Sequence, residues 1–305
     1  KESFILSGLD AGSYVVYADY SGDSNYAPSK DSVTIVVNNA INNILVYSSD
    51  VVYGKNATII VNADVDGEYT VVVGDRRLIV DVVNGSGDVE AALNAGRYDI
   101  VVEYVNDNYV NNVISVPFTV SKADIALTVE VLDKVYTADV SGNVFASVDG
   151  QYKVVIGNFE ALITVKDGVG SFNVGILGVG NYTASVSFDG TNNYNSANNE
   201  TTFEVTQTGT NFNIIASSTV ITYGGAVEIA QSLPGDATGS VTYRFANGTV
   251  IKVVGVKESF VLSDLDAGSY VVYADYSGSG KYAPACDSVT ITVSKANVTV
   301  SVEIS

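Results

Sequence analysis

The sequence of 305 residues contains no histidine, no methionine and no tryptophan, and it has one cysteine and four prolines. Without histidine, and with a single thiol, the chain lacks the usual general bases and nucleophile pairs of enzymes. Cys286 cannot form a disulfide within the chain. It stands where a related segment has Lys30, which indicates an incidental surface thiol. We therefore predict that the protein is not an enzyme and needs no cofactor.

Positive charge is also scarce, since 15 Lys and Arg residues stand against 34 Asp and Glu residues and give a formal net charge of −19. A nucleic-acid site needs clustered Lys and Arg to neutralise phosphates, so nucleic acid is excluded as a partner. An anionic membrane surface is excluded for the same reason. No apolar run reaches the ~18 residues of a membrane span. An acidic surface is typical of long arrays that must stay soluble and apart.

The most informative feature that is present is a repeat. Residues 1–22 return at 257–278 with 20 of 22 positions identical, and two diverged copies lie between them. One glycine marks the same place in each copy, at Gly12, Gly96, Gly180 and Gly268, with spacings of 84, 84 and 88 residues. A unit of about 85 residues is long enough to bury a modest core of its own. We therefore expect a tandem array that starts inside one repeat and stops inside another.

The composition favours strands. Valine, threonine and tyrosine are abundant and no stretch keeps a helical period, which predicts an all-β fold. In residues 39–122, short runs of strand-forming residues are separated by turns such as Asp66-Gly67 and Asn84-Gly85. The predicted strands are 43–48, 56–62, 68–73, 77–82, 86–91, 97–104 and 113–120. Seven short strands at this spacing indicate an immunoglobulin-like (Ig-like) β-sandwich.

The sixth predicted strand has the pattern Tyr-x-apolar-x-apolar-x-aromatic in every copy. Side chains alternate across a strand, so these residues share one face, which we expect to lie between two sheets. Each copy follows Leu-x-Ala/Val-Gly-x-Tyr, which is typical of a tyrosine corner, where the hydroxyl bonds to nearby backbone. The predicted core and corner residues are Leu9, Gly12, Tyr14, Tyr20, Leu93, Gly96, Tyr98, Tyr104, Leu177, Gly180, Tyr182, Phe188, Leu265, Gly268, Tyr270 and Tyr276.

After each of these strands, a polar turn ends at a second aromatic residue, at Tyr26, Tyr109, Tyr194 and Tyr282. Such aromatics could form a stacking platform for sugars. Their recurrence at one position of the repeat instead favours packing in the core.

The repeats follow one another without a Gly-, Ser- or Pro-rich linker, as Val120-Ser121-Lys122-Ala123 illustrates. We therefore expect tandem sandwiches that very short linkers join into an elongated rod. The expected units are the end of a repeat (the first segment, 1–38), the second repeat (39–122), the third repeat (123–207), the fourth repeat (208–294) and the first strand of a further repeat (295–305).

Three motifs carry a resemblance to a known family: Val52-Tyr53-Gly54, Leu93-x-Ala95-Gly96-x-Tyr98 and the segment Tyr20 to Tyr26. With them the whole chain resembles the bacterial-type Ig-like repeats of large surface proteins, which are especially numerous in adhesin-like proteins of methanogenic archaea. The resemblance implies an extracellular, cell-surface location and a stalk or adhesive role, without naming a ligand. Thr137 departs from the pattern, because Gly54 and Gly224 stand at its place in the other repeats, and this puts one turn in doubt.

Two further chemistries were weighed. Asp64-Val65-Asp66-Gly67 is an acidic turn of the kind that collects Ca²⁺. It lacks EF-hand spacing and has no evident equivalent in the third and fourth repeats, so a solvated turn is favoured and no metal ligand is named. Ig-like surface domains sometimes carry Lys–Asn isopeptide crosslinks, and Lys122 and Lys295 stand near joints. Both lie in polar junctions and not on apolar strand faces, which disfavours a crosslink.

The chain also contains the sequence Asn-x-Ser/Thr, the acceptor for N-glycosylation, several times. The candidate sites are Asn56, Asn84, Asn181, Asn199, Asn247 and Asn297. Because the chain is rich in Asn and Thr, two interpretations stay open, occupied sites that shield sheet edges and unoccupied sites that arise from composition.

These features together predict a structural role: a stalk or spacer segment of a large extracellular adhesin-like protein, which bears tension and projects an adhesive or anchoring element. One alternative is a subunit of an extracellular filament. Another is a module that binds glycan or protein through polar end loops such as 21–26 and 277–282. The expected partners are neighbouring repeats of the same chain, with lateral or end-to-end copies as a further option.

Overall fold

The computed structural model describes residues 3–303, and every regular element in this range is a β-strand. The alternation of apolar and polar residues explains this, since it gives each strand one face for a core and one for water. Residues 3–303 include no helix of the length and apolarity that a membrane crossing would need.

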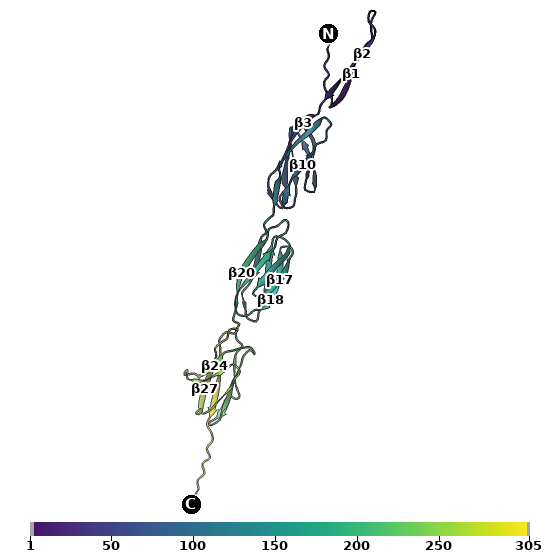
Figure 1. Ribbon diagram of the computed structural model, residues 1–305. Helices are drawn as coiled ribbons and strands as arrows, with labels where there is room; N and C mark the ends of the chain where they lie inside the picture. Colours follow the sequence, from purple (N-terminus) through teal and green to yellow (C-terminus); the bar gives the residue numbers. More distant parts are fainter. Residues whose placement is uncertain (1–2, 304–305) are drawn as a thin grey trace. The chain divides into compact units, whose positions relative to one another are not determined.

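The first segment forms an antiparallel hairpin of β1 (Gly12–Tyr20) and β2 (Ser29–Val37) (Figure 1). Its apolar side chains have no second sheet to cover them among the described residues, so Phe4 is 74% exposed and Val33 59% exposed. Tyr20 was predicted to lie in a core and is 46% exposed. That prediction was wrong for this copy, because a hairpin alone cannot enclose a side chain.

The second repeat forms a sandwich around one core. Its strands are β3 (Ala40–Ser48), β4 (Val51–Val52), β5 (Ala57–Ala63), β6 (Gly67–Val73), β7 (Arg76–Val82), β8 (Ser86–Ala91), β9 (Gly96–Tyr98), β10 (Ile100–Glu103), β11 (Tyr109–Ser115) and β12 (Phe118–Ser121). They pair in the orders β11-β3-β5-β8, β10-β6-β7 and β4-β12-β9. Buried residues from these sheets, including Ile59, Val71 and Phe118, form a single hydrophobic cluster.

The third and fourth repeats share one topology, a three-stranded sheet and a five-stranded sheet. The strands of the third repeat are β13 (Leu127–Val131), β14 (Lys134–Val135), β15 (Asp139–Ala146), β16 (Gly150–Ile156), β17 (Phe159–Val165), β18 (Val169–Ile176), β19 (Gly180–Phe188) and β20 (Ala197–Thr206). Those of the fourth are β21 (Asn213–Ala216), β22 (Val220–Thr222), β23 (Val227–Ser232), β24 (Ser240–Phe245), β25 (Val250–Gly255), β26 (Phe260–Leu262), β27 (Gly268–Tyr276) and β28 (Ala285–Ser294). The sheets run β13-β15-β18 with β14-β20-β19-β16-β17, and β21-β23-β26 with β22-β28-β27-β24-β25. The predicted all-β, Ig-like class is confirmed.

The second repeat departs from the other two in its last strand. The single strand predicted over 113–120 is two strands, β11 and β12, which pair in different sheets. Pro117 lies between them and has no N–H to donate to a ladder, so the pairing breaks there. The sixth strand, predicted over 97–104, is likewise divided at Asp99 into β9 and β10.

Three tyrosines that were not predicted as core residues, Tyr69, Tyr152 and Tyr243, are among the largest fully buried side chains. In the second and third repeats the hydroxyl donates to the carbonyl four residues earlier, from Tyr69 to Val65 and from Tyr152 to Val148, both at 2.6 Å. Burial raises the pKa of Tyr243 to about 12.

Contacts between residues divide the chain into two compact units. The first comprises residues 1–125 with 189–196, and the second comprises 126–188 with 197–305. The loop 189–196 of the third repeat is thus grouped with the second repeat, because its contacts lie there.

Candidate functional site at the repeat joints

The corner that precedes each sixth strand is fixed by its tyrosine. In all four copies the tyrosine hydroxyl donates to the main-chain carbonyl four residues earlier. The pairs are Tyr14 to Asp10 at 2.9 Å, Tyr98 to Asn94 at 2.8 Å, Tyr182 to Gly178 at 2.9 Å and Tyr270 to Asp266 at 3.1 Å. This bond closes the corner into a compact loop and leaves the N–H of the following residue free to meet another group.

The other predicted core and corner residues lie around this bond. Leu93 is 7% exposed, Phe188 7% and Tyr276 2%, whereas Leu9, Leu177, Leu265 and Tyr104 are half-buried. Gly12 and Gly180 have φ angles of 155° and 156°, a region that favours glycine. At Gly96 and Gly268 a Cβ would meet the corner tyrosine ring at an ordinary 3.7 Å, so space alone does not require glycine there.

The polar turn after each sixth strand is a preorganised loop, which we call the joint loop (23–26, 106–109, 191–194 and 279–282). Its first residue has a side-chain oxygen that accepts the main-chain N–H two residues later. The pairs are Asn25 to Asp23 at 2.7 Å, Asn108 to Asn106 at 2.9 Å, Asn193 to Thr191 at 3.2 Å and Lys281 to Ser279 at 3.3 Å. Such side-chain turns hold the backbone without help from a sheet, so the third residue of each loop is presented outward.

The joint loop also holds the linker that enters its own repeat. The main-chain carbonyl of the third loop residue accepts a linker N–H, from Ala40 to Asn108 at 2.9 Å, from Ala123 to Asn193 at 2.9 Å and from Thr208 to Lys281 at 3.1 Å. Ala283 and Asn195 donate back to Thr208 and Ala123, respectively. The linkers are therefore hydrogen-bonded and not free chain.

In the first unit, the side chain of the third joint-loop residue makes two hydrogen bonds to the corner of the preceding repeat. The main-chain N–H of Ala95 donates to Oδ1 of Asn193 at 2.9 Å, and Nδ2 of Asn193 donates to Oδ1 of Asn94 at 3.0 Å. The same pair of bonds joins Asn108 to the corner of the first segment, from Ala11 N–H at 2.7 Å and to Asp10 Oδ1 at 2.9 Å. We call this two-bond contact the asparagine clamp.

An aromatic pair accompanies each of two joints. The ring of Tyr53 meets that of Tyr194 edge-on at 5.3 Å, and Tyr136 meets Tyr282 edge-on at 5.9 Å. Tyr53 and Tyr136 lie in the short turn after β4 and β14, so the Val-Tyr-Gly motif supplies a joint contact.

That turn is kept in the third repeat despite Thr137. The main-chain N–H of Ala138 donates to the carbonyl of Val135, as Lys55 donates to Val52. Thr137 has φ of 82°, close to the 89° of Gly54. The turn that the sequence put in doubt is therefore present, with a β-branched residue in a backbone region that such residues rarely adopt.

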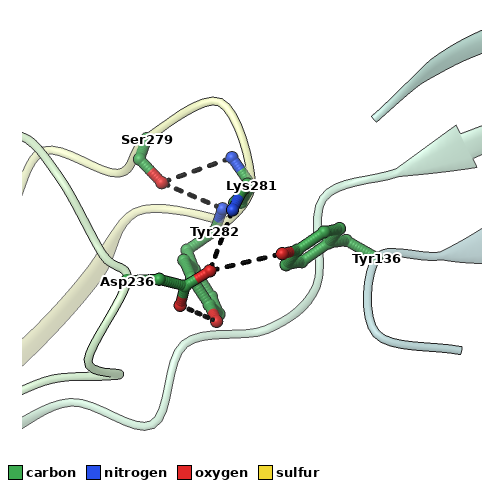
Figure 2. A network of polar contacts seen from close by, with 5 residues as sticks. All are labelled: Tyr136, Asp236, Ser279, Lys281 and Tyr282. Carbon is green, nitrogen blue, oxygen red and sulfur yellow. Dashed lines mark hydrogen bonds and ion pairs between the residues drawn. The ribbon is translucent and has the colours of Figure 1, made fainter. Parts of the chain in front are cut away.

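The joint in the second unit has a charged network instead of an asparagine (Figure 2). The carboxylate of Asp236 accepts hydrogen bonds from the hydroxyls of Tyr282 at 2.7 Å and Tyr136 at 3.2 Å, and pairs with Lys281 at 3.0 Å. The Nζ of Lys281 also lies 5.1 Å from the centre of the Tyr136 ring. Three side chains of the fourth repeat thus converge on one tyrosine of the third.

These contacts shift the ionisation of the network. The Tyr282 hydroxyl, and then Lys281, lower the pKa of Asp236 from 3.8 to about 2. The same bond to Asp236, followed by burial, raises the pKa of Tyr282 to about 12. Contacts with Tyr136 and Asp236 raise the pKa of Lys281. Both members of the ion pair are therefore charged across the ordinary pH range.

Two of the four second aromatics, Tyr194 and Tyr282, contact a tyrosine of the preceding repeat, and Tyr282 also belongs to the buried core of its own repeat. Tyr282 is 7% exposed and Tyr194 is half-buried, each against a tyrosine of the preceding repeat, whereas Tyr26 is 69% exposed. The prediction that they pack in their own cores was wrong for Tyr26. The recurring loop pattern, a short polar residue two positions before Asn or Lys and then Tyr, was the sequence signal for this site.

The acidic turn at Asp64–Gly67 has a structural role. Asp66 accepts the N–H groups of Asn84 at 3.0 Å and Gly85 at 2.9 Å. Asp149 occupies the equivalent turn of the third repeat and accepts the N–H of Gly168 at 3.4 Å, so the expectation that this turn is not repeated was wrong. Residues 3–303 contain no group of three or more His, Cys, Asp or Glu side chains arranged to hold a metal ion.

The remaining candidates lie apart from the joints or serve them. Lys122 donates through Nζ to the carbonyl of Thr191 at 2.8 Å, so it supports a joint loop and meets no asparagine side chain. Lys295 and Cys286 are exposed.

The glycosylation candidates Asn56, Asn84, Asn181, Asn247 and Asn297 are exposed. Asn199 is half-buried in β20 and accepts the N–H of Val129 at 3.3 Å.

Comparisons with known proteins give only distant likenesses. Neither a protein-family model nor a curated protein sequence matches the chain. Similar solved structures include a mutated variant of titin domains I67–I69, with 12% identity over 83% of this chain and 96% of that one and a TM-score of 0.35. The Escherichia coli adhesin FdeC has 15% identity over 83% and 96%, with a TM-score of 0.28. Fibronectin(III)-like modules of Clostridium thermocellum CbhA have 14% identity over 58% and 100%, with a TM-score of 0.25. The Ig-like assignment itself rests on the strand orders and buried cores described above.

Proposed function

We propose that this chain is a spacer segment of a large extracellular, cell-surface protein, in which Ig-like repeats bear tension and hold an adhesive or anchoring element away from the cell. In this role the chain performs no catalysis. Its partners are the repeats on either side of each unit, and the repeat bounds are those given by the sequence.

The observation that supports this proposal most is the joint. A flexible tether between domains would leave its linker in water, with Gly- or Ser-rich composition. Here Ala123 and Thr208 are hydrogen-bonded to joint loops, Asn193 binds the corner of the preceding repeat, and Asp236 and Tyr282 contact Tyr136 of the preceding repeat. A spacer needs this property, because a joint that resists bending keeps the distal end at a distance.

The terminal strands are suited to load. In the third and fourth repeats, the short second strand pairs in parallel with the last strand, β14 with β20 and β22 with β28, so the two ends of a repeat are joined side by side. A pulling force along the chain then acts across several backbone hydrogen bonds at once, which is the arrangement that resists extension.

Single-molecule stretching of the whole chain tests the proposal. Each repeat should unfold as one event that releases about 260 Å, the contour of ~85 residues less a folded length of ~40 Å. A matched control carries Gly-Gly-Ser-Gly inserted between Lys122 and Ala123. In electron micrographs the parent chain should be straight and the control should bend at one point. Extension without discrete events, or parent particles as bent as the control, would refute the proposal. Saturable glycan binding that is lost when residues 277–282 are changed would favour a binding module instead.

A further inference from the structure

The joints of this chain use two different chemistries, and the difference is not confined to one residue. Two joints use the asparagine clamp, through Asn108 and Asn193, and the third uses Lys281 at the same loop position. Asn25 holds that position in the first segment, whose sequence is otherwise nearly that of the fourth repeat. Lys281 is therefore a departure from the pattern and not its default.

The corner of the preceding repeat differs together with the loop residue. An asparagine clamp needs a side-chain acceptor on the corner, which Asp10 and Asn94 provide through Oδ1. The corresponding corner residue of the third repeat is Gly178, which has no side chain to offer. An asparagine at position 281 would find no side-chain acceptor for its Nδ2 at the Gly178 corner.

A third difference supplies what Lys281 needs. Asp236 lies between β23 and β24, in a connection of residues 233–239, whereas the connection between β15 and β16 spans only 147–149. This longer loop brings the carboxylate to Lys281 and to Tyr136. A corner without an acceptor, a lysine and an inserted acid thus occur together at one joint, and none of the three occurs at the other two.

We infer that the corner residue and the third residue of the joint loop form a matched pair that decides which repeat can follow which. A corner with Asp or Asn accepts a repeat whose loop carries Asn. A repeat whose loop carries Lys, together with the longer loop that bears Asp236, needs no side-chain acceptor on the corner and can therefore follow a corner with Gly. Each repeat end is then an interaction surface with a stated partner, a neighbouring Ig-like repeat of matching loop chemistry.

Position 178 has room for the substitution that tests this inference. Gly178 is exposed, its φ is not among the positive values, and a Cβ there would meet only the Tyr182 hydroxyl, at an ordinary 3.7 Å. Gly178→Asn should therefore fold, and together with Lys281→Asn it would rebuild the asparagine clamp at this joint.

The experiment compares Lys281→Asn, Gly178→Asn and the double variant in the whole chain, with amide hydrogen exchange as the readout. The amides of Thr208 and Ala283 report this joint, because Thr208 N–H donates to the carbonyl of Lys281 and Ala283 N–H donates to the carbonyl of Thr208. Lys281→Asn alone should raise their exchange roughly fivefold, the effect of one net hydrogen bond. Gly178→Asn alone should change little, and the double variant should return to within about twofold of the parent.

Salt separates the two chemistries. In the parent chain, these amides should exchange several-fold faster at about 500 mM NaCl than at about 20 mM, because an exposed ion pair is screened. The double variant should lose that dependence. Asn193→Lys is the mirror control and should open only the joint reported by Ala123 and Asn195.

Exchange in β27 shows that each variant is folded. If the double variant exchanges as fast as Lys281→Asn, or if Lys281→Asn has no effect, the matched pair does not exist. A rescued double variant that no longer responds to salt supports it.

Discussion

The buried tyrosines of the second and third repeats offer a sharp test of how polar groups are held in these cores. Tyr69 and Tyr152 are both fully buried, and both hydroxyls donate to a carbonyl at 2.6 Å. Only Tyr69 has a second bond, from Nδ2 of Asn42 at 2.9 Å. Asn42 is itself fully buried, and its Oδ1 has no partner. Tyrosine to phenylalanine at the two positions removes the same atom from two different environments.

The expected costs in stability follow from the polar groups that each substitution leaves without a hydrogen-bond partner. Tyr152→Phe removes one hydrogen bond and leaves one part-buried carbonyl, which should cost about 1–2 kcal/mol. Tyr69→Phe also leaves the amide of Asn42 with only a weak 3.5 Å contact to Asn111, so its cost should be about 2–4 kcal/mol. Adding Asn42→Ile should recover most of the difference, because it replaces the stranded amide by the residue that the third repeat has at that place, Ile125.

Hydrogen exchange in rising urea is the suitable assay, since a chain of several repeats has no single free energy of unfolding. Amides of β5 and β6 report the second repeat, and amides of β16 report the third. Each variant should affect its own repeat and leave the other as an internal control. The reasoning is refuted if Tyr69→Phe costs no more than Tyr152→Phe, or if Asn42→Ile fails to restore the Tyr69→Phe variant.

Three further results are expected. Thr137→Gly should stabilise the third repeat by up to about 1 kcal/mol, because it removes a strained φ but adds conformational freedom to the unfolded chain. Gly54→Thr should destabilise the second repeat, since it introduces the same strain. Chemical denaturation followed by hydrogen exchange measures both effects. Acid should open the charged joint, because the pKa of Asp236 is about 2 in the folded chain against 3.8 for a free carboxyl group. The carboxylate therefore contributes stability above about pH 4, and this contribution is lost as the pH falls through 2. Hydrogen exchange of the Thr208 amide would report the loss. If the Thr208 amide already loses its protection from exchange at pH 5, this assignment is contradicted. Gly142→Ala should destabilise the third repeat by about 1–3 kcal/mol, because a Cβ there would lie 2.5 Å from a main-chain oxygen that cannot move aside; an unchanged denaturation midpoint would show that the sheet yields.

The fold was largely predictable from local patterns. The alternation at Tyr98, Ile100 and Val102 is a local pattern of the sequence, and the corner bond of Tyr98 spans only four residues. The division of the last strand was also readable, because Pro117 cannot donate to a ladder. Tyr69 and Tyr152 were missed although the shared Asp-Gly-x-Tyr sequence precedes them in both repeats.

The joints were not predictable in the same way. The clamp on Ala95 comes from Asn193, 98 residues along the chain, and nothing in either local sequence names the other. A polar loop with one aromatic also reads as an ordinary solvated turn. Only the placement of a loop against the preceding repeat turns Asn193 or Lys281 into a joint residue, and that placement depends on the three-dimensional arrangement of two repeats.

The clamp at Asp10 has an evolutionary consequence. The corner Asp10-Ala11 and its near-duplicate Asp266-Ala267 have the same residues, so they offer the same acceptor and the same N–H. Recombination that duplicates the 256-residue block between the two copies would make Asn108 follow Asp266 as it now follows Asp10. A gene of this kind can change in length by whole blocks without creating a mismatched contact.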